Sequence, residues 1–176
     1  PSLKLVPLLS EEAKFATVAL LWKAPLNYLN KMTRIKGLIS LGQGVDHILN
    51  GNLIPENILV VRIVDPYMAK SMSHWVLLSI LNIIRETYGY FSQENTKIYK
   101  PRDEKNFLSL KIGVYGIGAI GSVVAKDLSY MGFNIQGWSR TKKKIKTITC
   151  LSGSEGFKAL ITNSDIHVCL LPLTPS

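Results

Sequence analysis

Residues 110–121 read LKIGVYGIGAIG, and this stretch decides the fold. Its apolar first half, 111–115, predicts a buried strand, and an apolar stripe along 120–131 predicts a helix directly after the glycine-rich turn. A further strand is predicted at 134–138, so that residues 110–140 form a strand–helix–strand unit.

The glycines of this turn match the pattern G-x-G-x-x-G. Gly116 permits a tight turn, Gly118 lets a pyrophosphate approach the backbone, and Gly121 lets the helix pack closely on the strand. The helix N-terminus, with Ala119 and Ile120, offers free N–H groups and partial positive charge to phosphates. Because the pattern stands between elements of suitable length, it predicts dinucleotide binding rather than an ordinary glycine turn.

The tip of the second strand of the unit indicates which dinucleotide is bound. NAD sites place an Asp or Glu there to hold the ribose diol. Here the strand ends in Trp138 and is followed by Ser139, Arg140, Thr141 and Lys142, with no acidic residue among them. A planar guanidinium, two hydroxyls and an ammonium suit a 2′-phosphate, so the sequence favours NADP(H) over NAD(H).

Strand and helix signals alternate along the rest of the chain. Several of the strands are apolar without alternation, which predicts that helices cover both faces of a parallel sheet. A long helix at 67–88 is apolar over most of its circumference and is therefore predicted to lie between layers. The other expected elements are strands at 17–22, 37–41, 59–63, near 148 and at 166–171, and helices at 26–32, from 46 and at 155–161.

Composition predicts a globular protein. The chain has 176 residues, 47% of them hydrophobic and 19% charged, with a formal net charge of +9. No apolar run is long enough to span a membrane, and scattered basic residues do not favour nucleic-acid binding. Cys150 and Cys169 stand apart in apolar surroundings, which is typical of reduced thiols. No secretory signal is visible, so we expect a cytoplasmic protein.

Six segments, taken in order, resemble the D-isomer-specific 2-hydroxyacid dehydrogenase family, and most closely its glyoxylate/hydroxypyruvate reductase branch. Together they cover nearly the whole chain and are far more specific than any one motif. They are LWKAP at 21–25, SLGQGVD at 40–46, VRIVDP at 61–66, the glycine turn, GWSR at 137–140 and LLPLTP at 170–175.

This resemblance implies a substrate site in the first half of the chain. The loop Gly42, Gln43 and Gly44 would offer backbone N–H groups to the carboxylate of a small 2-keto or 2-hydroxy acid, and Trp22 would border the pocket. The loop follows a predicted parallel strand, and such sheets bind ligands at the carboxyl ends of their strands. A plain turn between strand and helix is the alternative.

The resemblance also extends the cofactor site to Leu171, Pro172 and Thr174, which would line the ribose and nicotinamide side. In the family an Arg, a Glu and a His carry out catalysis, and all three lie beyond the position where this chain stops. No catalytic residue can therefore be assigned. Of the histidines, His74 and His167 are expected to be structural, and His47 to begin a helix.

We therefore expect an α/β chain with two doubly wound parallel-sheet domains, of Rossmann or flavodoxin-like type, joined by a long helix. Residues 1–65 would belong to a substrate-binding domain, 66–100 to the linking helix and connection, and 101–176 to an NADP-binding Rossmann domain. Such a domain needs about six parallel strands, and four can be counted, so we expect it to be incomplete and its last strand to be an edge.

Two readings of function remain open. The first is an NADPH-dependent reductase of glyoxylate or hydroxypyruvate, which acts as a homodimer and of which this chain is the amino-terminal and central part. The second is a non-catalytic NADP-binding remnant or sensor module. A methyltransferase with a Rossmann fold is disfavoured by the basic strand tip and by the order of the six segments.

Overall fold

The computed structural model describes residues 3–23, 26–49, 54–103 and 106–173. The described chain divides into two compact units, the first formed by the residues up to Asp65 together with Pro172 and Leu173, and the second by Pro66–Leu171; each unit is described by itself. In both of them the described strands run parallel.

The first unit holds a sheet of three strands in the order β1-β2-β3. Its core is a single apolar cluster, to which η1 and α1 contribute Ala13 and Ile48, the residue after η2 contributes Met32, and the strands contribute Ala19, Leu21 and Leu38. The described elements are η1 (Glu11–Phe15), β1 (Val18–Leu21), η2 (Leu26–Lys31), β2 (Gly37–Ser40), α1 (Asp46–Leu49) and β3 (Leu59–Arg62).

The expectation that both faces of this sheet are covered is wrong for the first unit. Ala19 and Leu21 are buried, whereas Val18 and Leu20, which alternate with them on β1, are about half exposed. Val61 on β3 is exposed as well. The reason is that η1, η2 and α1 contribute to one cluster on one face, so the apolar strand residues of the other face are left uncovered by the described helices.

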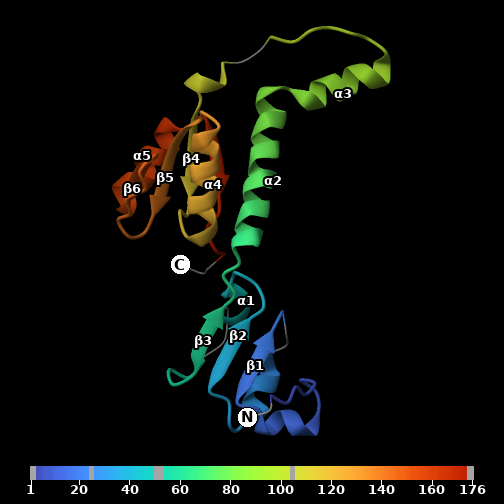
Figure 1. The fold of residues 1–176 in the computed structure, drawn as a ribbon, viewed down its shortest axis with the longest axis vertical. Helices are drawn as coiled ribbons and strands as arrows, with labels where there is room; N and C mark the ends of the chain where they lie inside the picture. The colour runs from blue at the N-terminus through green and yellow to red at the C-terminus, as the bar shows by residue number, and fades with distance from the viewer. Residues whose placement is uncertain (1–2, 24–25, 50–53, 104–105, 174–176) are drawn as a thin grey trace. The chain divides into compact units, whose positions relative to one another are not determined.

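The second unit holds a sheet with the strand order β6-β5-β4-β7. β5 and β6 therefore lie on one side of β4 and β7 on the other, and the chain reverses its direction of winding at β4. The elements are α2 (Pro66–Ile84), α3 (Thr87–Thr96), η3 (Phe107–Ser109), β4 (Lys111–Tyr115), α4 (Ala119–Tyr130), β5 (Asn134–Ser139), β6 (Thr149–Ser152), α5 (Gly153–Asn163) and β7 (Ile166–Cys169), as Figure 1 shows.

Helices cover the two faces of this second sheet. Ile112 and Val114 of β4 are fully buried in the cluster that α2 and α4 complete. On the other face, the ring of Tyr115 meets Phe157 of α5 edge-on at 5.4 Å between centroids, and a Cβ at Gly113 would contact Leu160 of α5 at 3.1 Å. The α/β fold with parallel sheets is thus confirmed, and the second unit is doubly wound.

The long helix is shorter than the sequence predicts. α2 ends at Ile84, Glu86 takes the left-handed conformation (φ 51°), and α3 begins at Thr87. The Glu86 carboxylate is ion-paired with the guanidinium of Arg102. The same guanidinium occupies the space that a Cβ at Gly89 would need, so a partner from beyond the helix fixes the break.

The prediction that the long helix is covered on most sides is also wrong. One stripe of α2, which includes Val76 and Ile80, is buried against α4 and the sheet. Trp75 is 66% exposed, and Leu78 and Ile83 are more than half exposed. Sequence shows that a helix is apolar but not what covers it. In the described part of the chain, no helix combines the length and apolar character that crossing a membrane requires.

Candidate functional site

The glycine turn lies at the carboxyl end of β4, at the point where the strand order reverses. Gly116 has φ +94°, a conformation that glycine adopts without strain. Its N–H donates to the carbonyl of Trp138 on β5 at 2.9 Å, and a Cβ on it would lie 2.9 Å from the carbonyl oxygen of Leu170. The turn is therefore held between the ends of two neighbouring strands.

The other two glycines of the turn lie in opposite surroundings. A Cβ at Gly121 would lie 2.1 Å from the carbonyl oxygen of Gly116, so α4 approaches the turn as closely as a glycine allows. A Cβ at Gly118 would meet nothing within 4 Å. Gly118 is the N-cap residue of α4, followed by Ala119 and Ile120. The open space thus lies at a helix N-terminus, which fits the pyrophosphate of a dinucleotide.

The tip of β5 is basic. Ser139 is buried, and its hydroxyl donates to the carbonyl of Thr141 at 2.8 Å, which closes the loop on itself. Arg140, Thr141 and Lys142 are exposed. The hydroxyl of Ser139 is thus occupied within the loop, and the exposed cations are the groups at the tip that suit a phosphate.

One residue beside this tip is absent from the set expected from sequence. The ammonium of Lys143 donates to the carbonyl of Ile117 in the glycine turn at 2.9 Å. The sequence signal was the run of lysines at 142–144. Sequence shows that this run is basic, but it does not show which of the three side chains turns toward the glycine turn. The contact joins two loops that α4 and β5 separate in sequence.

The end of β7 completes the surroundings of the turn. Leu170 donates its N–H to the carbonyl of Tyr115 at 2.9 Å. The Leu171 side chain would lie 3.1 Å from a Cβ at Gly116, so it contacts the turn. Pro172 is exposed, and Thr174 lies outside the described residues.

In the first unit, the Gly42–Gly44 loop follows β2 and is held from below by Ser40. The Ser40 hydroxyl is fully buried; it accepts from Gly42 N–H at 3.2 Å and donates to the carbonyl of Gly44 at 2.7 Å. Trp22 covers the loop so closely that a Cβ at Gly42 would lie 2.4 Å from its ring. The structure therefore brings Trp22 and all three loop residues together.

Gln43 links this loop to the end of the unit. Its side-chain N–H donates to the carbonyl of Asp65 at 2.9 Å, and its own carbonyl accepts from the Arg62 guanidinium at 2.9 Å. Its amide oxygen is buried and has no hydrogen-bond partner among the described residues. Because the chain passes from the first unit to the second after Asp65, Gln43 connects the loop to the point where the chain leaves the first unit.

The three histidines each have neighbours within their own unit. The rings of His47 and Trp22 are 6.0 Å apart between centroids, and His47 Nε2 lies 3.5 Å from the Ser40 hydroxyl. His167 Nδ1 is 2.8 Å from the Tyr115 hydroxyl, and His74 lies on α2. Over the described ranges, no three His, Cys, Asp or Glu side chains gather as a metal site would require.

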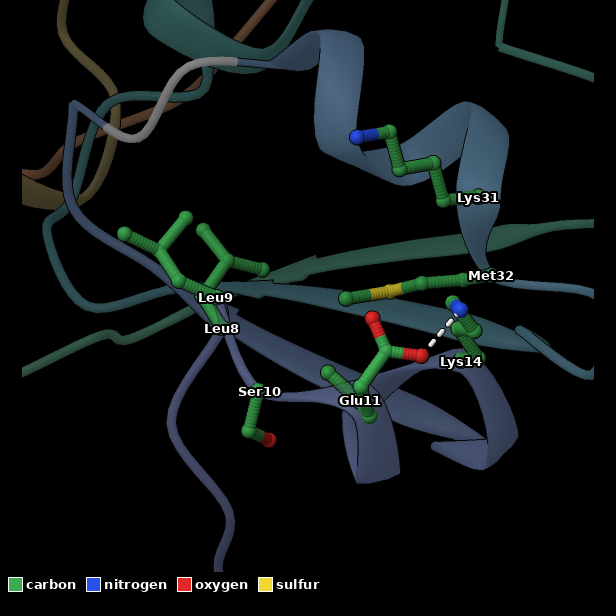
Figure 2. Close-up of a pocket in the computed structure, with 8 residues that line it drawn as sticks. Leu8, Leu9, Ser10, Glu11, Lys14, Lys31 and Met32 are labelled. Carbon is green, nitrogen blue, oxygen red and sulfur yellow. Dashed lines mark hydrogen bonds and ion pairs between the residues drawn. The ribbon is translucent and has the colours of Figure 1, made fainter.

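A cavity of about 230 Å³ lies elsewhere in the first unit. Figure 2 shows its lining residues, with Glu11 and Lys14 joined as an ion pair. A hydrogen bond and the positive charge from Lys14 lower the pKa of the Glu11 carboxyl. The lining residues precede β1 and β2, whereas the Gly42–Gly44 loop follows β2. Because parallel strands share one direction, the cavity and the loop lie at opposite ends of the sheet.

Comparisons with known proteins agree with this arrangement. Residues 75–176 match the family model described as D-isomer specific 2-hydroxyacid dehydrogenase, NAD binding domain. Glyoxylate/hydroxypyruvate reductase A of Yersinia enterocolitica is 33% identical over 165 residues, which are 91% of this chain and 53% of that protein. The chain spans about half the length of the curated relatives it matches.

Solved structures give the same result. A probable 2-hydroxyacid dehydrogenase from Rhizobium etli, in complex with NADP, is 34% identical with a TM-score of 0.85; the match covers 94% of this chain and 52% of that one. An NADPH-dependent glyoxylate/hydroxypyruvate reductase from Sinorhizobium meliloti, in complex with NADP and sulfate, is 29% identical with the same TM-score and the same coverage. The chain therefore belongs to the D-isomer specific 2-hydroxyacid dehydrogenase family, on its glyoxylate/hydroxypyruvate reductase branch.

Proposed function

We propose that this chain is the substrate-loop and cofactor-binding part of an NADPH-dependent reductase, which converts a small 2-keto acid such as glyoxylate or hydroxypyruvate into the 2-hydroxy acid. The observation that carries this proposal is the pairing of the glycine turn with a strand tip that is basic and lacks an acid. Relatives on the same branch are named for this activity, and the two solved structures described above were determined with NADP bound.

The residues of the second unit fit NADPH, which would supply the hydride. Gly118 leaves the space that a pyrophosphate needs, next to the N-terminus of α4. Gly116, Ala119, Ile120 and Gly121 form the rest of that turn. At the other end of the site, Arg140 would pair with the 2′-phosphate through its planar set of N–H donors.

Four further residues belong to the proposed cofactor site. Thr141 and Lys142 are exposed beside Arg140 and would border the 2′-phosphate, whereas Leu171 and Pro172 would face the ribose and nicotinamide side. Ser139 would act indirectly, because its hydroxyl shapes the tip by bonding to the Thr141 carbonyl.

The Gly42–Gly44 loop of the first unit would bind the carboxylate of the substrate. Gly42 N–H is already bonded to the Ser40 hydroxyl. The N–H groups of Gln43 and Gly44 have no acceptor among the described residues, and they are the donors that a carboxylate would use. Trp22, more than half exposed, would border the bound acid.

The test is titration of the 176-residue chain with NADPH and with NADH, followed by addition of glyoxylate. We expect NADPH to bind at least about tenfold more tightly, since one charge-assisted hydrogen bond contributes roughly 1.5–3 kcal/mol. Arg140→Ala should weaken NADPH binding and leave NADH binding unchanged. Equal affinity for the two nucleotides, or binding of neither, would contradict the proposal. Binding without oxidation of NADPH would agree with catalytic groups that lie beyond residue 176, or with a sensor role.

We further propose a cytoplasmic homodimer. The support for a dimer is an exposed apolar stripe of α2, where Met68, Trp75 and Leu78 lie at spacings of seven and three residues and so share one face, since exposed apolar patches of this kind mark interaction sites. Sedimentation should give a dimer whose dissociation constant rises at least tenfold in Leu78→Glu. Even a weak dimer, with a dissociation constant on the order of 100 µM, would be partly formed at that concentration. A chain that stays fully monomeric there would refute the dimer.

A further inference from the structure

Lys143 differs from its neighbouring lysines in having a fixed acceptor. All four lysines of the loop, Lys142, Lys143, Lys144 and Lys146, are exposed. Lys142, Lys144 and Lys146 make no hydrogen bond or ion pair with any residue that the structure describes. The ammonium of Lys143 donates to the carbonyl oxygen of Ile117 at 2.9 Å. The side chain therefore folds back from its loop onto the glycine turn.

The acceptor of this hydrogen bond is rigidly held. Ile117 is fully buried, and its N–H donates to the carbonyl of Trp138 at 3.1 Å. Its side chain fills the space over Gly137, where a Cβ would lie 2.6 Å from the Ile117 Cγ2 atom. Any group bonded to the Ile117 carbonyl is thus placed at a defined point beside the turn.

The ammonium keeps its charge and two of its donors. A lysine has three N–H donors, of which the carbonyl uses one. A carbonyl does not neutralise the charge, and none of the described carboxylates is ion-paired with Lys143. An ammonium in this state attracts an anion from solvent, and a phosphate accepts both remaining hydrogen bonds.

We propose that Lys143 is a specificity-determining residue that recognises the 2′-phosphate of the cofactor. The proposal rests on the NADP site proposed above. Lys143 is four residues beyond the end of β5, and the ribose 2′ position of a bound dinucleotide lies at this strand tip. Its ammonium is already held by the hydrogen bond to the Ile117 carbonyl, whereas a lysine without such a partner loses more rotamer freedom when it binds a phosphate. Of the basic residues in this loop, Lys143 therefore contributes most to the preference for NADP over NAD.

The experiment compares Lys143→Met with Lys144→Met, since both variants remove one charge from the same loop. Dissociation constants for NADPH and NADH are measured by calorimetry. For Lys143→Met we expect NADPH binding to weaken about 10- to 100-fold, the loss of one charge-assisted hydrogen bond, and NADH binding to change less than about threefold. Lys144→Met should change both by less than about threefold. Lys143→Arg, which keeps the charge, should recover most of the NADPH affinity.

Three outcomes would overturn the inference. Equal losses of NADPH and NADH affinity in Lys143→Met would assign Lys143 to the pyrophosphate or to the turn. Equal losses in the two methionine variants would show a general effect of loop charge. Both results presuppose that the unchanged chain binds NADPH, so the proposed function would survive them. Absence of NADPH binding by the unchanged chain would refute the proposed function, and this inference with it.

Discussion

Gly118 and Gly121 allow the fold and the binding role of the glycine turn to be separated by two alanine substitutions. At Gly121 the new Cβ would lie 2.1 Å from the carbonyl oxygen and 2.9 Å from the carbonyl carbon of Gly116. Both are backbone atoms, so α4 and the turn must move apart. Overpacking of this kind costs typically 1–3 kcal/mol, and the better helix propensity of alanine returns at most about 1 kcal/mol.

The net loss expected for Gly121→Ala is therefore about 2 kcal/mol, and the contact with rigid backbone places it toward the upper end of the overpacking range. For a chain of this length each kcal/mol lowers Tm by roughly 2–4 °C, so we expect a decrease of about 4–8 °C without cofactor. Gly118→Ala should change Tm by less than about 2 °C, because the new methyl group meets nothing within 4 Å and the effects on the helix cap and on the unfolded chain oppose each other.

Gly118→Ala, which should hardly change Tm, should nevertheless weaken nucleotide binding. The methyl group of Gly118→Ala would project into the space proposed for the pyrophosphate, so NADPH affinity should fall at least about tenfold, which corresponds to 1.4 kcal/mol. Differential scanning fluorimetry and NADPH titration measure the two quantities on the same samples. The reasoning would be refuted if Gly118→Ala kept the unchanged affinity, or if it lost as much Tm as Gly121→Ala.

Three further changes test contacts within the units. Burial by itself would raise the pKa of Asp127, but hydrogen bonds and positive charge, chiefly from Lys70, outweigh burial, so that the pKa is lowered. The stability that this carboxylate contributes is present above the unfolded pKa of about 3.9 and is lost as the pH falls through the lower folded pKa. The difference in Tm between Asp127→Asn and the unchanged chain should therefore shrink as the pH falls below about 4. Burial raises the pKa of Tyr115, so the stability that its neutral phenol contributes is lost as the pH rises above about 10. Urea melts should show that Tyr115→Phe removes this loss of stability at alkaline pH. A loss of the same size in the variant would exclude Tyr115 as its source. Gln43→Ala removes the hydrogen bond to the Asp65 carbonyl. Amide exchange of the Gly42–Gly44 loop should quicken about fivefold, as expected for a bond worth about 1 kcal/mol. Unchanged exchange would mean that the loop is held by other contacts.

Local sequence patterns were enough to predict the order of the strands and helices. Each expected strand lies within about two residues of an observed one, because buried strands and amphipathic helices leave periodic signals in the sequence. The glycine turn was predicted from the spacing of Gly116, Gly118 and Gly121 together with the strand and helix on either side of it. Spacing could not show that a Cβ at Gly121 meets backbone whereas one at Gly118 meets open space.

Contacts between residues distant in sequence account for what could not be predicted. The break after α2 depends on Glu86, whose ion pair is with Arg102, sixteen residues further along. The hydrogen bond from Lys143 to Ile117 spans twenty-six residues and joins two loops, which have no periodicity to interpret. The hydrogen bond from Gln43 to Asp65 is likewise a contact between two loop residues.

The different surroundings of the two glycines bear on how such a chain would evolve. Selection for folding alone acts on Gly121, because any larger residue there separates α4 from the turn. Folding places little constraint on Gly118, because its surroundings would accept a methyl group. In a lineage that no longer bound a nucleotide, Gly118 would drift first while Gly121 persisted. The residues found at these two positions in closely related sequences would therefore distinguish a working nucleotide-binding protein from a decaying remnant.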